Sequence, residues 1–222
     1  MPRTIVVGDI HGCLIAFNAL LNAIQLAPTD TLVTVGDYVD RGPDSKGVLD
    51  RLLELEQSCN LVPLLGNHEE MLLAVLERRM EPYGWLNHGG VQTMDSYGFN
   101  GDLECVPKSH RDLMNRMPSY YENDTHFVVH ANYEPTLPLD EQPSELLRWI
   151  KISDFLPEPH VNGKRAIVGH THDRKGEIFE LPHLVCIDTY CYGGKWLTAL
   201  ELETGRIWQS TPDGFLIDRE MS

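Results

Sequence analysis

Short apolar runs, each followed within two residues by a polar side chain, recur along this chain. The runs lie at residues 4–7, 31–35, 61–65, 127–129 and 166–168. Such continuous runs are typical of parallel strands that are buried on both faces. Apolar positions at residues 14–24 and 69–80 instead have helical spacing. The alternation predicts an α/β fold in which the polar residues gather at the carboxyl ends of the strands.

The last part of the chain becomes strand-rich again. Residues 184–187, 196–202 and 206–208 have β-type composition, and Glu203-Thr204-Gly205 gives a turn signal. We therefore predict a second sheet, and a two-sheet α/β sandwich flanked by helices that forms one domain over residues 1–222. Residues 81–116 and 134–159 are less regular, and we expect the second of these segments to shape the substrate opening.

The polar residues that follow the runs are of metal-ligand type. They are Asp9, His11, Asp37, Asn67, His130 and His170. Two nearby cations repel each other, and a bridging carboxylate lowers that cost, so we expect Asp37 to be the bridge. If residues 9–11 are extended, the Asp-x-His spacing directs Asp9 and His11 to one ion. A mixed oxygen and imidazole set suits manganese, iron or zinc better than calcium, and we expect two ions of manganese.

Composition narrows the class of protein. With 222 residues, 42% of them apolar, the chain can bury one sizeable core. A formal charge of −15, from 33 acidic and 18 basic residues, disfavours a nucleic-acid partner. The chain has five cysteines, an odd number without C-x-x-C spacing, and this indicates a reducing compartment. We interpret all five as packing residues: Cys13, Cys59, Cys105, Cys186 and Cys191. Because no signal peptide or long apolar segment is visible, we expect a cytoplasmic monomer without a membrane partner.

Three motifs carry a family resemblance. They are Gly8-Asp9-Ile10-His11-Gly12, Gly36-Asp37-Tyr38-Val39-Asp40-Arg41-Gly42 and Gly66-Asn67-His68-Glu69. Together they resemble the signature of the metal-dependent serine/threonine protein phosphatases, in the bacterial and phage branch of the calcineurin-like metallophosphoesterase superfamily. The likeness continues over nearly the whole chain, at Gly12-Cys13, Trp85-Leu86, Gly89-Gly90, His130-Ala131-Asn132-Tyr133, Gly169-His170-Thr171 and Ile187-Asp188-Thr189.

The resemblance implies a role for each residue. Asp9, His11 and Asp37 would hold the first metal, and Asp37, Asn67, His130 and His170 the second. His68 matches a general acid, which Asp40 orients. The matching phosphate-binding residues are Arg41, Asn67 and His68. A second phosphate-binding residue is expected near Trp149, at Arg148 or, in another register, at Lys151. His172 is a candidate seventh ligand, whereas His88 follows no strand and is not assigned.

Three functions fit these motifs. The resemblance implies a phosphomonoesterase acting on phosphoserine and phosphothreonine in proteins or peptides, with phosphotyrosine as a further substrate, through direct attack by a metal-bridging hydroxide. The first alternative is a symmetrical diadenosine tetraphosphate hydrolase, a related family that has Ala in place of Asp40 and Asp in place of Glu69. The second alternative is a phosphopeptide-binding module without catalysis. Asp40 and Glu69 favour the protein phosphatase.

Overall fold

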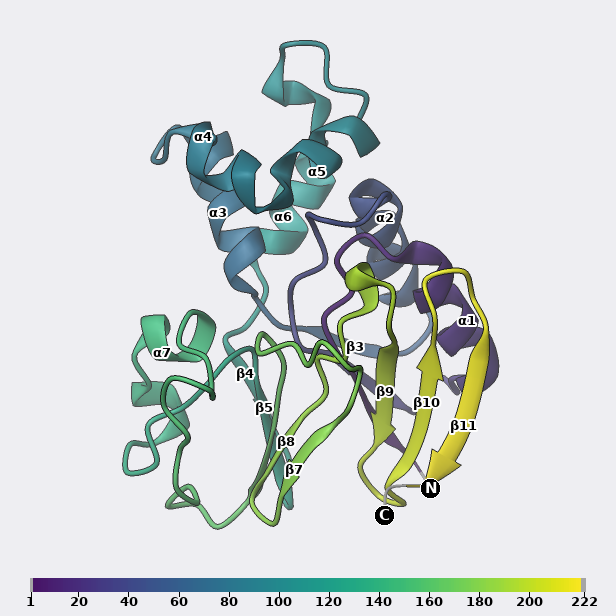
Figure 1. Ribbon diagram of the computed structural model, residues 1–222, viewed down its shortest axis with the longest axis vertical. Helices are drawn as coiled ribbons and strands as arrows, with labels where there is room; N and C mark the ends of the chain where they lie inside the picture. Colours follow the sequence, from purple (N-terminus) through teal and green to yellow (C-terminus); the bar gives the residue numbers. More distant parts are fainter. Residues whose placement is uncertain (1, 221–222) are drawn as a thin grey trace.

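The computed structural model describes residues 2–220 and contains two mixed sheets with helices around them (Figure 1). One sheet has six strands in the order β11-β10-β9-β1-β2-β3. Its strands are β1 (Thr4–Val7), β2 (Thr31–Thr34), β3 (Asn60–Pro63), β9 (Leu197–Glu201), β10 (Arg206–Ser210) and β11 (Leu216–Glu220). The other has five strands in the order β4-β5-β6-β8-β7. These are β4 (Tyr120–Glu122), β5 (His126–Val129), β6 (Arg165–Val168), β7 (Phe179–Leu181) and β8 (Leu184–Cys186). The predicted two-sheet α/β sandwich is confirmed. The assignment of residues 196–202 and 206–208 to the second sheet was wrong, because β9 and β10 join the sheet of β1 to β3 and β9 pairs with β1.

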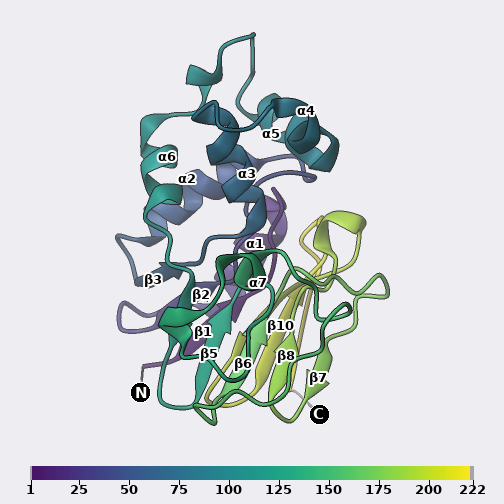
Figure 2. The same cartoon turned by 90° about the vertical axis from the view of Figure 1, so that its left-hand side faces the viewer.

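The strand directions determine where the polar residues gather. β1, β2 and β3 are parallel to one another, and so are β5, β6 and β8. The two parallel sets lie side by side, as Figure 2 shows. Because the carboxyl ends of parallel strands share one edge of a sheet, the residues after these six strands meet at one end of the sandwich.

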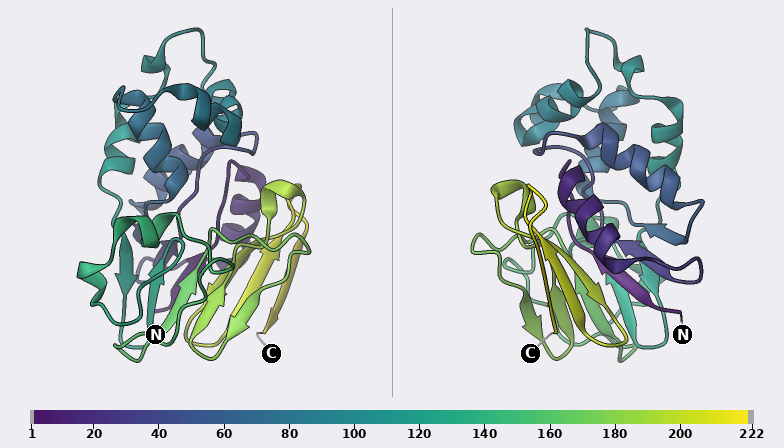
Figure 3. Two further views of the ribbon diagram at one scale, coloured as in Figure 1. Left: turned by 60° about the vertical axis from the view of Figure 1, so that its left-hand side comes forward. Right: turned by 90° about the vertical axis from the view of Figure 1, so that its right-hand side faces the viewer.

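Apolar packing holds the layers together. Val6, Val33, Val128 and Ile167 are fully buried and belong to one cluster drawn from both sheets. The helices are α1 (Leu14–Ile24), α2 (Ser45–Leu55), α3 (Asn67–Leu76), α4 (Pro82–Trp85), α5 (Val91–Ser96), α6 (Lys108–Asn115) and α7 (Ser144–Arg148). Helix α1 packs on β9 and β10, and α2 on β3, while α3 to α6 gather beyond the carboxyl ends of the strands (Figure 3). The candidate ligands therefore lie between the sandwich and this helical layer.

The helix predicted over residues 69–80 is present as α3, but its bounds differ. It begins at Asn67, where Glu69 forms a capping box with Gly66, and it ends at Leu76. Residues 81–116, which lack clear periodicity, contain α4, α5 and α6. A π-helical turn over Leu86–Gly90, with Gly89 at φ 109°, interrupts the helical repeat there. That interruption hides the helices from a periodicity search.

Among residues 2–220, no helix combines the length and apolar character needed to cross a membrane. All five cysteines are free thiols. The cytoplasmic location and the monomeric state stay predictions.

Candidate metal centre

Five parallel strands deliver the predicted ligands to one place. Asp9 and His11 follow β1, and Asp37 follows β2. Asn67 and His68 begin α3 directly after β3, while His130 follows β5 and His170 follows β6. All of these side chains are buried except that of His170, which is partly exposed.

Asp37 lies between two groups of candidate ligands. Its Oδ2 is 3.4 Å from Nε2 of His11, and its Oδ1 is 3.4 Å from Nε2 of His130. There are two groups of potential ligand atoms, and within each group the atoms lie within 4.8 Å of one another. Both groups contain Asp37. One adds His11 and His68, and the other adds His130 and His170. One carboxylate thus offers a different oxygen to each group, which is the geometry required of a bridge.

Three histidines each donate a hydrogen bond from one ring nitrogen to a backbone carbonyl. Nδ1 of His11 donates to the carbonyl of Val39 at 2.8 Å, and Nδ1 of His130 donates to that of Val35 at 3.0 Å. His170 uses Nε2 in the same way, donating to the carbonyl of Trp149 at 3.0 Å. A backbone acceptor on one nitrogen leaves a lone pair on the other, as metal-binding histidines require.

These lone pairs face other acceptors. Nε2 of His130 lies 3.0 Å from Oδ1 of Asn67. With Nδ1 of His130 carrying its proton, both atoms are hydrogen-bond acceptors and repel each other unless a cation lies against them. Nε2 of His11 lies 3.4 Å from Oδ2 of Asp37, but it also accepts a hydrogen bond from Nη1 of Arg41 at 3.0 Å. The donor set around His130 therefore fits a cation.

Asp9 gives independent support for a cation. Its Oδ2 accepts a hydrogen bond from the backbone N–H of His170 at 3.0 Å, but within residues 2–220 its buried Oδ1 has no hydrogen-bond partner. Burial, followed by the negative charges of Asp188 and Asp37, raises the pKa of Asp9 well above its usual value. A buried carboxylate oxygen without a donor is costly, and a divalent ion would satisfy it.

The loops that carry the ligands are turned rather than extended. His11 has φ 44° and Asp37 has φ 54°, and Asp40 and Arg41 also lie in the left-handed region. The premise of an extended Asp-x-His segment was therefore wrong, because His11 itself lies in the left-handed region. Residues in this region cost free energy and persist only where surrounding contacts impose them.

Glu69 supplies those contacts for the Asp37 loop. Its buried carboxylate accepts hydrogen bonds from the backbone N–H groups of Asp37 at 2.9 Å, Tyr38 at 2.8 Å and Val39 at 3.1 Å. It also accepts from that of Gly66 at 3.2 Å. Glu69 is thus directed to the backbone and holds the turn that positions Asp37.

His68 differs from the other histidines of the centre. Its Nδ1 bonds to Oδ2 of Asp40 at 2.6 Å, and that carboxylate also accepts from Nε1 of Trp85 at 2.8 Å and from Oγ1 of Thr93 at 2.6 Å. Burial alone would lower the pKa of His68, but the charge of Asp37 and the hydrogen bond to Asp40 raise it above its usual value.

The pKa shifts of the candidate ligands have the opposite sign. Burial lowers the pKa of His11 to about 4 and that of His170 to about 3, and it also lowers the pKa of His130. Neutral imidazoles bind metals, whereas a protonated one can donate a proton. The pKa shifts therefore separate His68, the candidate proton donor, from the three candidate ligands.

Arg41 lies at the edge of the centre against Tyr192 and Gly89, two residues to which the sequence analysis gave no role. Its guanidinium lies 4.6 Å from the centre of the Tyr192 ring, and its Nη1 is 3.0 Å from Nε2 of His11. The backbone of Gly89 approaches so closely that a Cβ there would lie 2.5 Å from the nitrogen of Arg41. The Gly89-Gly90 pair was a usable signal for this contact, whereas Tyr192 followed no pattern.

Asp188 is a further residue to which the sequence analysis gave no role, and here a signal existed. It follows β8 as Asp9 follows β1, after an apolar run, and its side chain is buried beside Asp9. Burial and the charge of Asp37 raise the pKa of Asp188 to about 7. A sixth parallel strand therefore also ends at the centre.

Three further candidates, Arg148, Lys151 and His172, lie outside the two groups of candidate ligands. Nε and Nη2 of Arg148 donate to the two carboxylate oxygens of Glu70, at 3.1 and 3.2 Å. His172 stacks on Tyr190, with ring centres 4.6 Å apart, and belongs to neither group of candidate ligands. Lys151 lies near His170, where its charge contributes to the lowered pKa of that histidine. The phosphate-binding role of Arg148 or Lys151 and the ligand role of His172 stay predictions.

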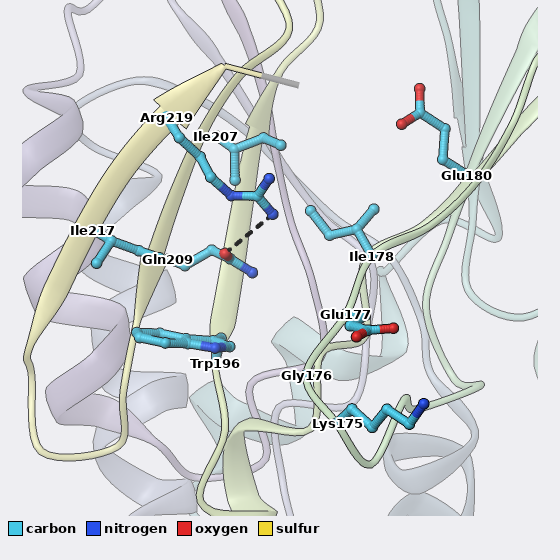
Figure 4. Close-up of a pocket in the computed structure, with 10 residues that line it drawn as sticks. All are labelled: Lys175, Gly176, Glu177, Ile178, Glu180, Trp196, Ile207, Gln209, Ile217 and Arg219. Atoms are coloured by element: carbon cyan, nitrogen blue, oxygen red, sulfur yellow. Dashed lines mark hydrogen bonds between the residues drawn. The ribbon is translucent and has the colours of Figure 1, made fainter. Parts of the chain in front are cut away.

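A separate cavity of about 530 Å³ lies between the edges of the two sheets (Figure 4). Trp196, Gln209 and Arg219 line it from one side and residues 175–178 from the other, and Nη2 of Arg219 is 3.5 Å from Oε1 of Gln209. No candidate ligand lines this cavity, so the chemistry of the protein is not located there.

Comparison with known proteins establishes the class. Residues 2–174 match the family model of the calcineurin-like phosphoesterases. This chain therefore belongs to that family of metal-dependent phosphoesterases. Its likeness to a phage branch of the protein phosphatases stays a prediction.

Individual relatives differ in what their names say they act on. The chain is 30% identical to serine/threonine-protein phosphatase 1 of Salmonella typhimurium over 180 residues, which cover 75% of this chain and 74% of that protein. It is 52% identical to a symmetrical bis(5'-nucleosyl)-tetraphosphatase of an Acidovorax strain, but over 69 residues that span 31% of this chain and only 24% of that protein. A crystal structure provisionally named a diadenosine tetraphosphatase superposes with a TM-score of 0.69 at 25% identity and covers 99% of this chain and 95% of its own.

Proposed function

We propose that this protein hydrolyses dinucleoside polyphosphates at a two-metal centre, with diadenosine tetraphosphate as the first substrate to test. The observation that carries the proposal is the likeness to a provisionally named diadenosine tetraphosphatase, which extends over nearly the full length of both chains. The local identity of 52% to a symmetrical bis(5'-nucleosyl)-tetraphosphatase supports it. The proposal favours the alternative over the protein phosphatase that the motifs suggested.

The residues of the centre would divide the work of hydrolysis. Asp9 and His11 would hold one divalent ion, and Asn67, His130 and His170 the other. Asp37, which belongs to both groups of candidate ligands, would be shared between them. Bound ions of this kind supply positive charge that acidifies a water molecule and polarises the phosphoryl group. Arg41 would bind two phosphoryl oxygens through its planar guanidinium, and His68 would give its Nε2 proton to the leaving oxygen.

A second candidate function is favoured by one specific contact. The buried pair of His68 and Asp40 holds a proton donor in place, and a serine or threonine alkoxide needs such a donor much more than a phosphate leaving group does. The match to serine/threonine-protein phosphatase 1 over 74% of its length agrees with this function. Phosphoserine and phosphothreonine esters are therefore the second class of substrate to test.

Glu69 and Asp40, the two residues that favoured a protein phosphatase in the sequence analysis, have different contacts in the structure. The carboxylate of Glu69 accepts hydrogen bonds from backbone N–H groups of the loop around Asp37 and of Gly66, so the length of this side chain affects that loop rather than the substrate. Asp40 acts on the leaving group through His68. Of these two residues, only Asp40 gives a chemical reason to favour a protein phosphatase.

One comparison tests both candidates. The manganese-loaded protein is assayed on diadenosine tetraphosphate and on a phosphothreonine peptide, each with and without chelator, with the Asp37→Asn variant as the inactive control. We expect chelator-sensitive release of ADP as the only nucleotide product, which reports symmetrical cleavage. Faster hydrolysis of the peptide would replace the first candidate by the second. Activity on neither substrate would favour the phosphopeptide-binding module.

A further inference from the structure

Arg41 contacts a candidate metal ligand directly, because its Nη1 lies 3.0 Å from Nε2 of His11. Nδ1 of His11 lies 2.8 Å from the carbonyl oxygen of Val39, which can only accept, so Nδ1 carries the ring proton and Nε2 has the lone pair. A guanidinium group can only donate. Nε2 of His11 therefore accepts a hydrogen bond from Arg41 through the lone pair that a metal ion would use.

The surroundings of His11 favour this position of the guanidinium. Oδ2 of Asp37 lies 3.4 Å from the same Nε2, and the side chains of His11 and Asp37 are almost completely buried. Two acceptors this close repel each other unless a positive group lies against them, and Arg41 supplies such a group. One lone pair cannot serve two partners. Donation by Arg41 and coordination of an ion at Nε2 therefore exclude each other.

The backbone of Arg41 is fixed, so only its side chain can change partner. The backbone N–H donates to the carbonyl of Gly89 at 3.2 Å, and a φ of 69° places the residue in the left-handed region. The guanidinium lies 4.6 Å from the centre of the Tyr192 ring. Contact with the face of a ring uses none of the N–H donors. Arg41 can therefore turn its donors away from His11 and keep its contact with Tyr192.

Arg41 also lines a hollow of about 390 Å³ at the edge of the centre. Tyr192, residues 87–89 and Gln92 complete the lining. Within residues 2–220, no carboxylate belongs to this lining. A guanidinium turned into the hollow meets no protein anion there, so its donors stay available to a phosphoryl group.

We propose that Arg41 and the first metal ion compete for Nε2 of His11, and that occupation of this nitrogen by the ion releases the guanidinium to bind phosphate. The phosphate-binding arginine is then available only in protein whose first metal position is filled. Phosphate and that ion bind with positive coupling, because each of them disfavours the pairing of Arg41 with His11. The inference goes beyond the proposed function and rests on it only for the phosphoryl group that Arg41 binds.

Chemical modification of arginines tests this exchange without any turnover. Phenylglyoxal reacts with guanidinium groups, and mass spectrometry of peptides gives the rate at Arg41 in chelator-treated and in manganese-loaded protein. We expect Arg41 to react about three to ten times faster in the loaded protein, which is the factor for one hydrogen bond, and inorganic phosphate should then protect it. Arg165 is the matched control, since it is also partly exposed and donates to a side chain, that of Glu180. Its rate should not change with manganese.

Manganese binding to the Arg41→Ala variant gives a second readout. Equilibrium dialysis with elemental analysis should show one ion bound about three to ten times more tightly than in the unaltered protein, and the other within about twofold. Loss of a positive charge by itself would tighten both ions, because Asp37 belongs to both groups of candidate ligands.

The proposal is overturned if Arg41 reacts no faster with manganese than without it, or if Arg165 accelerates as much as Arg41 does. It is also overturned if Arg41→Ala leaves both manganese affinities unchanged or raises both equally. The proposed function fails separately, if the manganese-loaded protein does not hydrolyse diadenosine tetraphosphate, which none of these measurements uses.

Discussion

The imidazole of His68 and the carboxylate of Asp40 form a hydrogen bond of 2.6 Å in which both side chains are almost completely buried. The other histidines of the centre donate instead to backbone carbonyls. A carboxylate partner favours the protonated ring, whereas a carbonyl partner leaves a neutral ligand. This single difference of partner assigns the proton donor.

Replacing His68 by Asn should lower turnover on an alkyl phosphate much more than on an aryl phosphate. The expected loss on the alkyl ester is about a hundredfold to ten-thousandfold, because its alkoxide must be protonated as it leaves. Steady-state kcat on phosphoserine and on p-nitrophenyl phosphate measures the contrast. Trp85→Phe, which removes one donor to Asp40, should act in the same direction but less strongly. Equal losses on both esters would remove His68 as the general acid.

Asp37→Asn should abolish the binding of at least one ion, since Asp37 is the residue common to both groups of candidate ligands. Elemental analysis should find two ions in the unaltered protein and fewer in the variant. Manganese should also raise the melting temperature of the unaltered protein. At a free concentration one hundred times Kd, binding adds about 2.7 kcal/mol to the free energy of unfolding. The surface variant Asp112→Asn should behave as the unaltered protein does. Two ions retained in Asp37→Asn would exclude a bridge.

Gly89→Ala should weaken phosphate binding much as Arg41→Ala does. A Cβ at Gly89 would displace the backbone of Arg41, and both variants should raise KM by about tenfold. Gly101 offers a matched control, because it has φ 102° but no atom within 4 Å of an added Cβ. Gly101→Ala should therefore lose stability through its backbone conformation while keeping KM. A rise in KM in both glycine variants would show that backbone strain alone is responsible.

Glu70→Gln should tighten the binding of inorganic phosphate severalfold. Glu70 now accepts from two nitrogens of Arg148 and from the indole of Trp149 at 2.7 Å, so a neutral amide would release the guanidinium toward an anion. Calorimetry with Glu70→Gln and Arg148→Ala measures this, and Arg148→Ala should bind phosphate more weakly. Unchanged affinity in Arg148→Ala would remove Arg148 as a phosphate-binding residue.

Asp30 should make stability depend on pH in the acid range. Burial opposes its ionisation, but hydrogen bonds from the Arg3 side chain and from the backbone of Ala27 and Arg3 lower the pKa of Asp30 below 3.8. The contribution of Asp30 to the free energy of unfolding is therefore complete above pH 3.8, and it is lost as the pH falls through the lower pKa of the folded state. Asp30→Asn should cost about 1–3 kcal/mol near neutral pH. Denaturant unfolding should show this difference shrinking below pH 3.8, and a constant difference would contradict the assignment.

The sequence by itself determined the positions of the ligands along the chain. An apolar run sets a buried parallel strand, and the residue that follows it must emerge at the carboxyl edge of the sheet. This local rule placed Asp9, Asp37, Asn67, His130 and His170, and it would have found Asp188 after β8 if it had been applied there. The second sheet was predicted from the strand-rich segments at residues 184–208, and the structure places two of those strands, β9 and β10, beside β1 instead.

Only the tertiary structure decided which residues surround those ligands. Asp40 meets Trp85 and Thr93, and Arg41 meets Tyr192, across long stretches of chain. The hollow that Arg41 lines likewise forms between segments that are distant in sequence. Such neighbours are fixed by how layers pack, which no periodicity encodes. The candidate metal ligands were therefore readable from the sequence, because they depend on strand ends, whereas substrate choice depends on contacts that exist only in the folded chain.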